Sequence, residues 1–265
     1  MYQNGRLLLA IVVTLIAVVL LPAVPAASQP GALDDEKQQS LTIYGWIYGQ
    51  NGDIIVQGIE ADVDVSISDA WDALSALDGL FVLHYENRNG PRTLFADVMY
   101  TRLEASAGTA LGDVTFDQST TIAELGWAVR TARKERSDGR VSTGEWLAGV
   151  RYTRLALGLA GPLGTIDVDG TRDWFDLFIG GRVAGDLSDR WGYWVRGDIG
   201  GFGIGSSSDF TWNLILGLNY DMGSQWDLEL GWRWLDYSYD DGSGADRFEY
   251  DVLSSGPFTG ITYSF

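Results

Sequence analysis

The sequence predicts an all-β protein, a closed antiparallel up-and-down transmembrane β-barrel of about ten strands. Three observations lead to this prediction. From Leu41 onward most of the chain alternates apolar and polar residues with a period of two, which is typical of strands with two different faces. Aromatic residues lie towards both ends of the clearest alternating segments. The composition, with 34 glycines and 11 tryptophans, also favours β structure.

The composition excludes several classes of protein. The chain has no cysteine, so disulfides, thiolate metal sites and cysteine nucleophiles are excluded. Its formal net charge of −18 opposes binding to nucleic acid, because a polyphosphate would be repelled. No pattern in the sequence indicates a cofactor, and we expect none.

The first residues are typical of a cleavable signal peptide, which we predict to span 1–27. Arg6 precedes the apolar run 7–21, and small residues follow in the positions that a signal peptidase reads. An uncleaved helical anchor is the alternative. Residues 28–40 are polar and without pattern, which predicts a flexible periplasmic lead-in before a barrel domain at 41–265.

The segments 210–221 and 225–239 show the alternation most clearly. Each has one apolar face and one face that is mostly polar. One such strand fits a soluble sheet, as in a lipocalin-like barrel, or a membrane barrel with lipid outside. Aromatic residues at both ends of an aliphatic band favour the membrane barrel, because they form the girdles at its two interfaces. The expected girdle comprises Trp212, Tyr220, Trp226, Trp232 and Trp234.

Turn signals divide the barrel domain into ten expected strands, with eight or twelve as alternatives. An even number returns both ends of the barrel to the periplasmic side, where most of the expected connections are tight. The expected strands are 41–49, 79–88, 93–105, 118–132, 145–158, 172–185, 191–204, 209–221, 225–239 and 246–265.

Residues 50–78 break the pattern of single strands. Ile67, Trp71, Leu74 and Leu77 follow a Ser/Asp cap at helical spacing, which predicts a short amphipathic helix. We expect it in the first extracellular loop, either plugging the barrel or capping it from outside.

The chain closes on the segment PFTGITYSF, in which Ile261, Tyr263 and Phe265 point to one side. We expect this strand to pair with the first strand and close the barrel. The ending resembles the C-terminal assembly signal of Gram-negative outer-membrane barrels, which the barrel-assembly machinery reads. The barrel domain resembles small OmpA-like or opacity-type barrels, and the pattern GDIGGFGIG…DFTW…LGLNYD…LGWRWLDYSYDDG is most similar to an uncharacterised outer-membrane subgroup. The resemblance implies fold and location in the outer membrane, with lipid and lipopolysaccharide as surroundings.

If the alternation holds, the inward face carries acids and arginines in equal number. A buried charge is costly unless it is paired, so this balance predicts an ion-pair network inside a narrow barrel. A constriction lined by opposed charges, as in a small pore, is the alternative. The predicted network comprises Glu86, Arg88, Asp97, Glu124, Arg151, Asp176, Arg182, Arg196, Asp198, Glu229 and Arg233, with Arg130 on the same face.

Surplus acid lies outside the barrel wall, in the lead-in, in the first loop and in the last loop. Clustered carboxylates suit hard cations, so weak capture of divalent cations is an option, although we expect no specific metal site. The residues are Asp34, Asp35, Glu36, Asp53, Glu60, Asp62, Asp64, Asp69, Asp72, Asp78, Asp240, Asp241 and Asp246.

His84 is the single histidine and shares an inward face with Glu86. A lipid-modifying enzyme would use it as a base, but no inward serine flanks it on its own strand. We therefore expect a hydrogen-bonded interior histidine and no catalytic residues. The expected function is a structural or surface-interaction barrel with a narrow or plugged lumen, with a small porin-like diffusion pore as the alternative and an enzyme as a third option.

Overall fold

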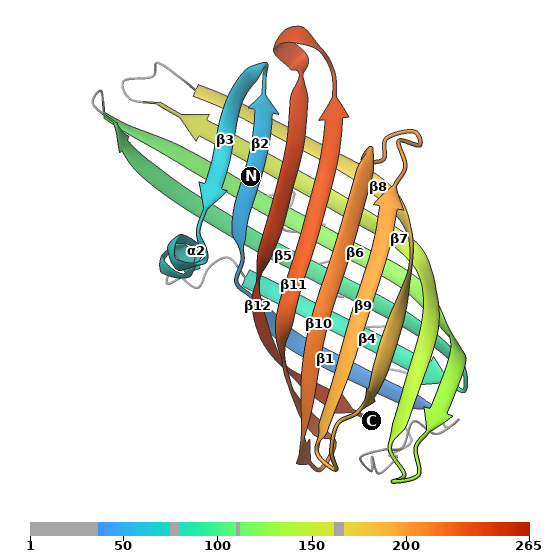
Figure 1. The fold of residues 1–265 in the computed structure, drawn as a ribbon. Coiled ribbons are helices and arrows are strands. Elements are labelled where there is room, and N and C mark those ends of the chain that lie inside the picture. Colours follow the sequence, from blue (N-terminus) through green and yellow to red (C-terminus); the bar gives the residue numbers. More distant parts are fainter. Residues whose placement is uncertain (1–36, 75–79, 110–111, 162–166) are drawn as a thin grey trace.

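The computed structural model describes residues 37–74, 80–109, 112–161 and 167–265. Within these ranges ten antiparallel strands close into an up-and-down barrel, as predicted (Figure 1). They are β1 (Gln38–Trp46), β4 (Leu80–Asn89), β5 (Arg92–Thr109), β6 (Gly112–Glu135), β7 (Val141–Ala160), β8 (Asp167–Asp186), β9 (Trp191–Gly201), β10 (Phe210–Gly223), β11 (Trp226–Asp241) and β12 (Phe248–Ser264). The expected signal peptide and most of the lead-in lie outside the described residues.

The pairing of the last strand with the first closes the barrel. In β12 the segment 258–264 pairs with β1, and Ile261 lies directly opposite Ile43. Gln39 and Phe265 exchange both backbone hydrogen bonds, at 3.1 and 2.8 Å. Closure therefore leaves this part of the sheet without an unpaired edge.

Two strands and a helix occupy the segment that broke the sequence pattern. The strands β2 (Gly49–Val56) and β3 (Ile59–Val65) form a hairpin, and α2 (Ile67–Leu74) follows it. The helix confirms the predicted amphipathic segment, although Leu77 lies outside the described residues. Ser66 caps it, because its Oγ accepts from the Asp69 amide while Asp69 accepts from the Ser66 amide.

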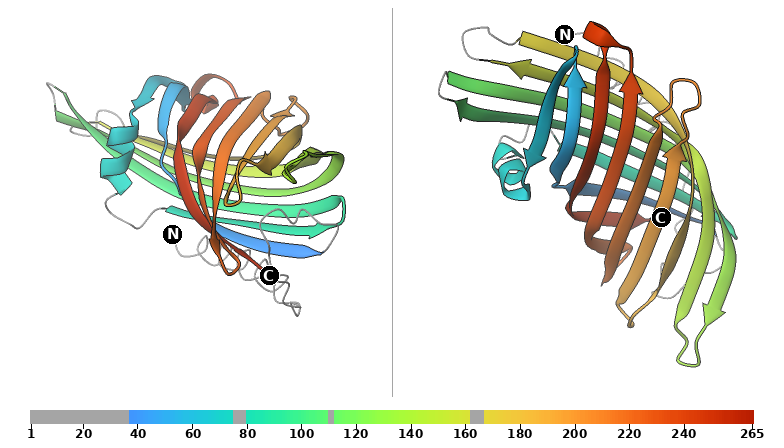
Figure 2. Two further views of the ribbon diagram at one scale, coloured as in Figure 1. Left: turned by 60° about the horizontal axis from the view of Figure 1, so that its bottom comes forward. Right: turned by 45° about the horizontal axis from the view of Figure 1, so that its top comes forward.

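The β2–β3 hairpin extends the barrel wall. Beyond its contact with β1, β12 pairs with β2, so the wall continues through β2 to β3 (Figures 1 and 2). Ile54, Val56 and Val63 of the hairpin are buried in the interior core. The helix α2 contacts β2 and β5 at the margin of this wall. The first loop is therefore largely part of the wall, where the sequence suggested only a plug or a cap.

The two ends of the barrel differ. At one end, called here the terminal end, β1 begins, β12 finishes and four short connections join β4 to β5, β6 to β7, β8 to β9 and β10 to β11. The opposite end, called the far end, holds the β2–β3 turn, the β9–β10 loop and the β11–β12 loop with the 3₁₀ turn η2 (Gly244–Asp246).

Apolar side chains fill the interior of the far half. Trp174 of β8 is fully buried, stacks on Tyr239 with ring centroids 4.2 Å apart and meets Tyr237 edge to face at 5.6 Å. The hydroxyls of Tyr237 and Thr153 lie 2.8 Å apart, which joins β11 to β7. A cavity of about 10 Å³ is found among these groups. That volume is at the lower limit for one water molecule.

The outer face carries an apolar band. Nine of the ten barrel strands bear a large hydrophobic residue that is at least 37% exposed. One example from each is Ile43, Leu94, Leu125, Trp146, Leu177, Ile199, Leu216, Leu230 and Ile261. Towards the far end the outward residues become charged, as in the exposed pair of Arg102 and Asp117. Among the described residues, no helix has the length and hydropathy to cross a bilayer.

The hairpin carries a testable electrostatic feature. Asp53 lies directly opposite both Asp62 and Asp251, and its pKa is raised by the hydrogen bond with Asp62 and by these acidic neighbours. A raised pKa means that the folded hairpin favours the protonated form and loses stability as the pH rises through that pKa. We expect Asp53→Asn to slow amide exchange in β2 and β3 at neutral pH, after correction for intrinsic rates, and to change it little near pH 3.

Asp64→Asn is the matched control, because Asp64 lies opposite Asn51 and faces no carboxylate across the hairpin. Equal protection in the two variants at neutral pH would contradict the assignment.

Candidate functional site: a charged layer and an interior chamber

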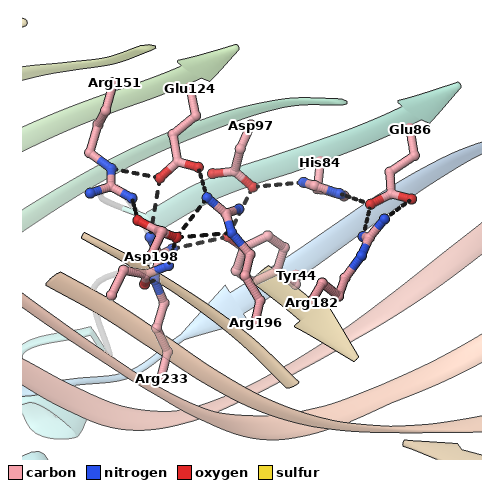
Figure 3. A network of polar contacts seen from close by, with 11 residues as sticks. Tyr44, His84, Glu86, Asp97, Glu124, Arg151, Arg182, Arg196, Asp198 and Arg233 are labelled. Carbon is pink, nitrogen blue, oxygen red and sulfur yellow. Dashed lines mark hydrogen bonds and ion pairs between the residues drawn. The ribbon is translucent and has the colours of Figure 1, made fainter. Parts of the chain in front are cut away.

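Three arginines and two carboxylates meet in the middle of the barrel (Figure 3). Arg151 donates from Nε to Glu124 and from Nη2 to Asp198, each at 2.7 Å. Arg196 donates to Glu124 at 2.8 Å and to Asp198 at 3.0 Å. Arg233 lies 3.7 Å from Glu124. These five residues are called the charged layer.

The charged layer is buried and closely bonded. Asn213 joins its parts, because the amide donates to Asp198 at 2.9 Å and its oxygen accepts from Arg233 at 3.0 Å. Removing one partner from such a buried set leaves an uncompensated charge, so the layer tolerates little change. It follows that this layer fixes the spacing of β6, β7, β9 and β11 across the interior.

Each arginine of the charged layer lies over the face of an aromatic ring. The Cζ atom of Arg151 lies 5.1 Å from the Phe178 ring centroid, and that of Arg196 lies 5.0 Å from the Phe95 ring. Arg233 is placed 4.9 Å from the ring of Trp46. Each distance suits a cation–π contact, which is strengthened where water is excluded.

Glycines make room for the inward aromatic rings. In five cross-strand pairs an inward aromatic residue lies directly opposite a glycine on the neighbouring strand. A Cβ at any of these glycines would overlap its aromatic partner. The pairs are Phe95 with Gly126, Phe178 with Gly149, Trp194 with Gly217, Phe258 with Gly231 and Tyr44 with Gly260. Each aromatic side chain therefore occupies the space that a side chain at the opposite glycine would take. This leaves room in the middle of the barrel.

A second cluster continues the charged layer towards the terminal end. Tyr44 accepts from Arg233 at 3.3 Å and donates to Asp97 at 3.1 Å. His84 lies 3.2 Å from both Asp97 and Glu86. Beyond it, Glu86 accepts from Arg182, which also donates to Glu145 at 2.8 Å. A continuous path of polar contacts thus crosses the interior (Figure 3).

His84 is held in a defined protonation state by its neighbours. Nδ1 lies within hydrogen-bond distance of Asp97, and Nε2 within hydrogen-bond distance of Glu86. An ionised carboxylate only accepts hydrogen bonds, so both ring nitrogens carry a proton when both bonds form. In this arrangement His84 is a cation of the network.

Two residues predicted in the network lie apart from its ion pairs. Asp176 is opposite Arg151, but that arginine turns to Glu124 and Asp198. Asp176 instead accepts from the Ser208 amide at 2.8 Å, from the Ser208 hydroxyl at 2.9 Å and from Trp174. It therefore ties the β9–β10 loop to β8.

Glu229 is the other exception. It accepts from Trp194 Nε1 at 3.0 Å and from the Thr262 hydroxyl at 3.4 Å, both of which are neutral donors. Arg88 is placed at the rim, 3.8 Å from Glu145 and 3.9 Å from Glu86. Arg130 is half-buried beside a register shift between β6 and β7.

Several members of the site lie outside the network predicted from the sequence. Glu145 shares the inward face of Arg151 by period two, but it stood at the expected start of its strand and was not counted as inward. Asn213 and Tyr44 bridge charges without being charged themselves. Only the folded distances reveal their partners.

An interior chamber of about 240 Å³ lies between the charged layer and the terminal end. Its walls include the second cluster, Glu229, Trp194 and Phe258. A further hollow of about 360 Å³ at the terminal end shares Trp194 with the chamber and is bordered by three of the short connections. We call this hollow the mouth of the chamber.

The girdle and C-terminal residues lie on the outer face. Trp226 and Tyr263 are in ring contact at 4.7 Å near the terminal end, and Trp232 lies 6.1 Å from Trp234 further along β11. Trp212 and Tyr220 are outward on β10, and Ile261 is 46% exposed. Phe265 stacks with Tyr263 at 5.9 Å. Within the described ranges, the acidic loop residues form no cluster of three or more metal-binding side chains.

The charged layer generates a stability prediction. Glu124→Gln removes a charge that balances three arginines, and we expect a loss of about 3–5 kcal/mol in the free energy of unfolding. Urea unfolding of the refolded barrel measures it. Asp117→Asn is the control, because it breaks an exposed pair with Arg102 and should cost about 0–1 kcal/mol. Equal losses would show that burial of the layer contributes nothing.

The glycine–aromatic pairs generate a second prediction. Gly126→Ala places a methyl group in the position of the Phe95 ring, which in turn supports Arg196. We expect this overpacking to cost about 1–3 kcal/mol. Gly197→Ala is the matched control, since nothing lies closer than 3.9 Å to a Cβ there. If both variants unfold at the same urea concentration, Gly126 is not needed to make room for the Phe95 ring.

Comparisons with known proteins show similarities at low identity. No protein-family model matches the chain, and no curated protein sequence matches it. The attachment invasion locus protein Ail of Yersinia pestis is 12% identical with a TM-score of 0.36, over 87% of this chain and 99% of Ail. Neisserial surface protein A is 12% identical with a TM-score of 0.32, over 91% and 100%. The P. putida toluene transporter TodX is 11% identical with a TM-score of 0.32, over 90% and 92%. The barrel described above rests on the chain's own strand pairing.

Proposed function

We propose that the chain is an integral outer-membrane β-barrel with a structural or surface-interaction role and a lumen that does not conduct. The observation that supports this proposal is the combination of an apolar outer band with an interior that side chains fill across its middle. Both features follow from the same alternation. At the height of the band, apolar side chains point outward and charged side chains point into the lumen.

The dimensions of the band support the membrane location. On β10 the outward face runs from Phe210 to Tyr220, with aliphatic residues between. Ten residue steps extend about 33 Å along a strand, or about 25 Å along the barrel axis at a tilt of about 40°. That height matches the apolar band of an outer-membrane barrel, and aromatic residues at both limits match its interfaces.

The connections support an orientation with the terminal end towards the periplasm. Outer-membrane barrels keep their short turns on that side and their longer connections outside. The far end, with its charged hairpin and loops, would then face the cell exterior and be available to surface partners. Lipid and lipopolysaccharide would surround the band.

The packing of the middle and far half supports a non-conducting lumen. An ion entering the chamber would meet the charged layer and then the aromatic core, where the cavity is only about 10 Å³. Hydrated ions need a continuous water path, and small barrels commonly fill their interiors with side chains. The observation that favours the alternative, a diffusion pore, is the set of charged side chains that line the chamber.

An enzymatic role finds less support. His84 would have to accept a proton, whereas both its ring nitrogens face carboxylates. It is therefore a poor general base in this arrangement.

Single-channel recording tests the proposal. We expect no conductance steps from the refolded mature chain in a planar bilayer. We expect steps from the double variant Trp174→Ala/Tyr237→Ala, because it removes two large rings that meet across the far half.

The double variant Trp127→Ala/Trp146→Ala is the matched control, since both rings lie on the outer face, 52% and 64% exposed. It should remain silent. Steps from the unmodified chain would establish the pore and reject the closed lumen.

A further inference from the structure

Glu229 is the carboxylate of the chamber whose charge the fold leaves unbalanced. Its hydrogen bonds come from the Trp194 indole and the Thr262 hydroxyl. Within the described ranges, no ion pair joins Glu229 to an arginine, lysine or histidine. The other carboxylates of the chamber, such as Glu86 and Glu124, each bind at least one cationic side chain.

An aromatic wall lies beside this carboxylate. Phe258 stands between Trp194 and Tyr44, with ring centroids 5.9 and 6.0 Å away, and all three line the chamber. Each ring lies opposite a glycine, at Gly217, Gly231 and Gly260. The chain thus keeps the wall aromatic and the space in front of it open.

The mouth of the chamber favours positive charge. Asp221 and Asp227 lie directly opposite each other on β10 and β11, and Glu229 follows two residues further along β11. The charged residues bordering the mouth are five acids and two arginines, namely Asp138, Asp186, Asp189, Asp221, Asp227, Arg140 and Arg190. Like charges in register are unfavourable, so the fold retains here an arrangement that stability alone would not select.

We propose that the chamber is a binding site for a small organic cation of the alkylammonium class, with Glu229 as the counter-ion. Trp194, Phe258 and Tyr44 supply ring faces, which attract ammonium groups once water is excluded. An anion would meet the unbalanced carboxylate, while the chamber's arginines already bind carboxylates. A chamber of about 240 Å³ accommodates a ligand of this size.

Titration of the refolded mature barrel with choline tests the proposal. The measurement is isothermal calorimetry in a non-ionic detergent, because phosphocholine detergents would compete. The matched ligand is 3,3-dimethylbutan-1-ol, which has the shape of choline without its charge. We expect saturable binding of choline, and binding of the alcohol weaker by about tenfold or more.

Four variants locate the site. Glu229→Gln keeps the shape of the side chain and should weaken choline binding by about tenfold or more. Glu104→Gln, at an exposed position on the outer face of β5, should leave it unchanged. Trp194→Leu should weaken binding and Trp194→Phe should retain most of it, which tests the wall if Glu229→Gln does not fold.

The proposal is overturned if choline shows no saturable binding, or if choline and the alcohol bind equally. It is also overturned if a folded Glu229→Gln variant keeps the affinity of the unmodified chain. Folding of each variant is checked by far-ultraviolet circular dichroism and by the shift in electrophoretic mobility on heating.

Discussion

Arg151, Arg196 and Arg233 meet Glu124 and Asp198 in the middle of the barrel, and the position of this layer determines what can lie on either side of it. Its members come from the neighbouring strands β6 and β7 and from β9 and β11 further round the wall. A buried charge requires its partner at a fixed distance, so these strands cannot separate or slide without leaving a charge uncompensated. The layer divides the interior into an aromatic far half and a polar chamber.

The pairing of aromatic rings with glycines makes this division possible. A ring on one strand takes the volume that the opposite glycine lacks, so large side chains fit inside without widening the wall. Phe95 and Phe178 then offer their faces to arginines of the layer, and Trp194 and Phe258, like Phe95, line the chamber. The same pairing of a ring with a glycine supports the arginines of the charged layer and leaves the chamber open.

Glu229 differs from the other carboxylates that line the chamber because neutral groups hold it in place. Trp194 and Thr262 fix its orientation without cancelling its charge. Residues that stability does not explain are candidates for function, since folding alone tends to pair or remove buried charge. The contrast with Glu124, which three arginines surround, is the physical basis for treating the chamber as a binding site.

The residue pattern was enough to predict the ten-stranded barrel and the direction of most interior side chains. Period-two alternation predicted ten strands and placed Glu124, Arg196 and Arg233 inside, because alternate residues of a strand must face opposite sides. The pairing of the interior charges became visible only in the folded barrel. In the folded barrel Asp176 binds Ser208 instead of an arginine, and Glu145 belongs to the network. Glu229 forms no ion pair among the described residues, and residues 49–65 are part of the wall. Alternation fixes only the face of a residue, whereas pairing depends on distances across the interior, which the curvature and register of the closed sheet set.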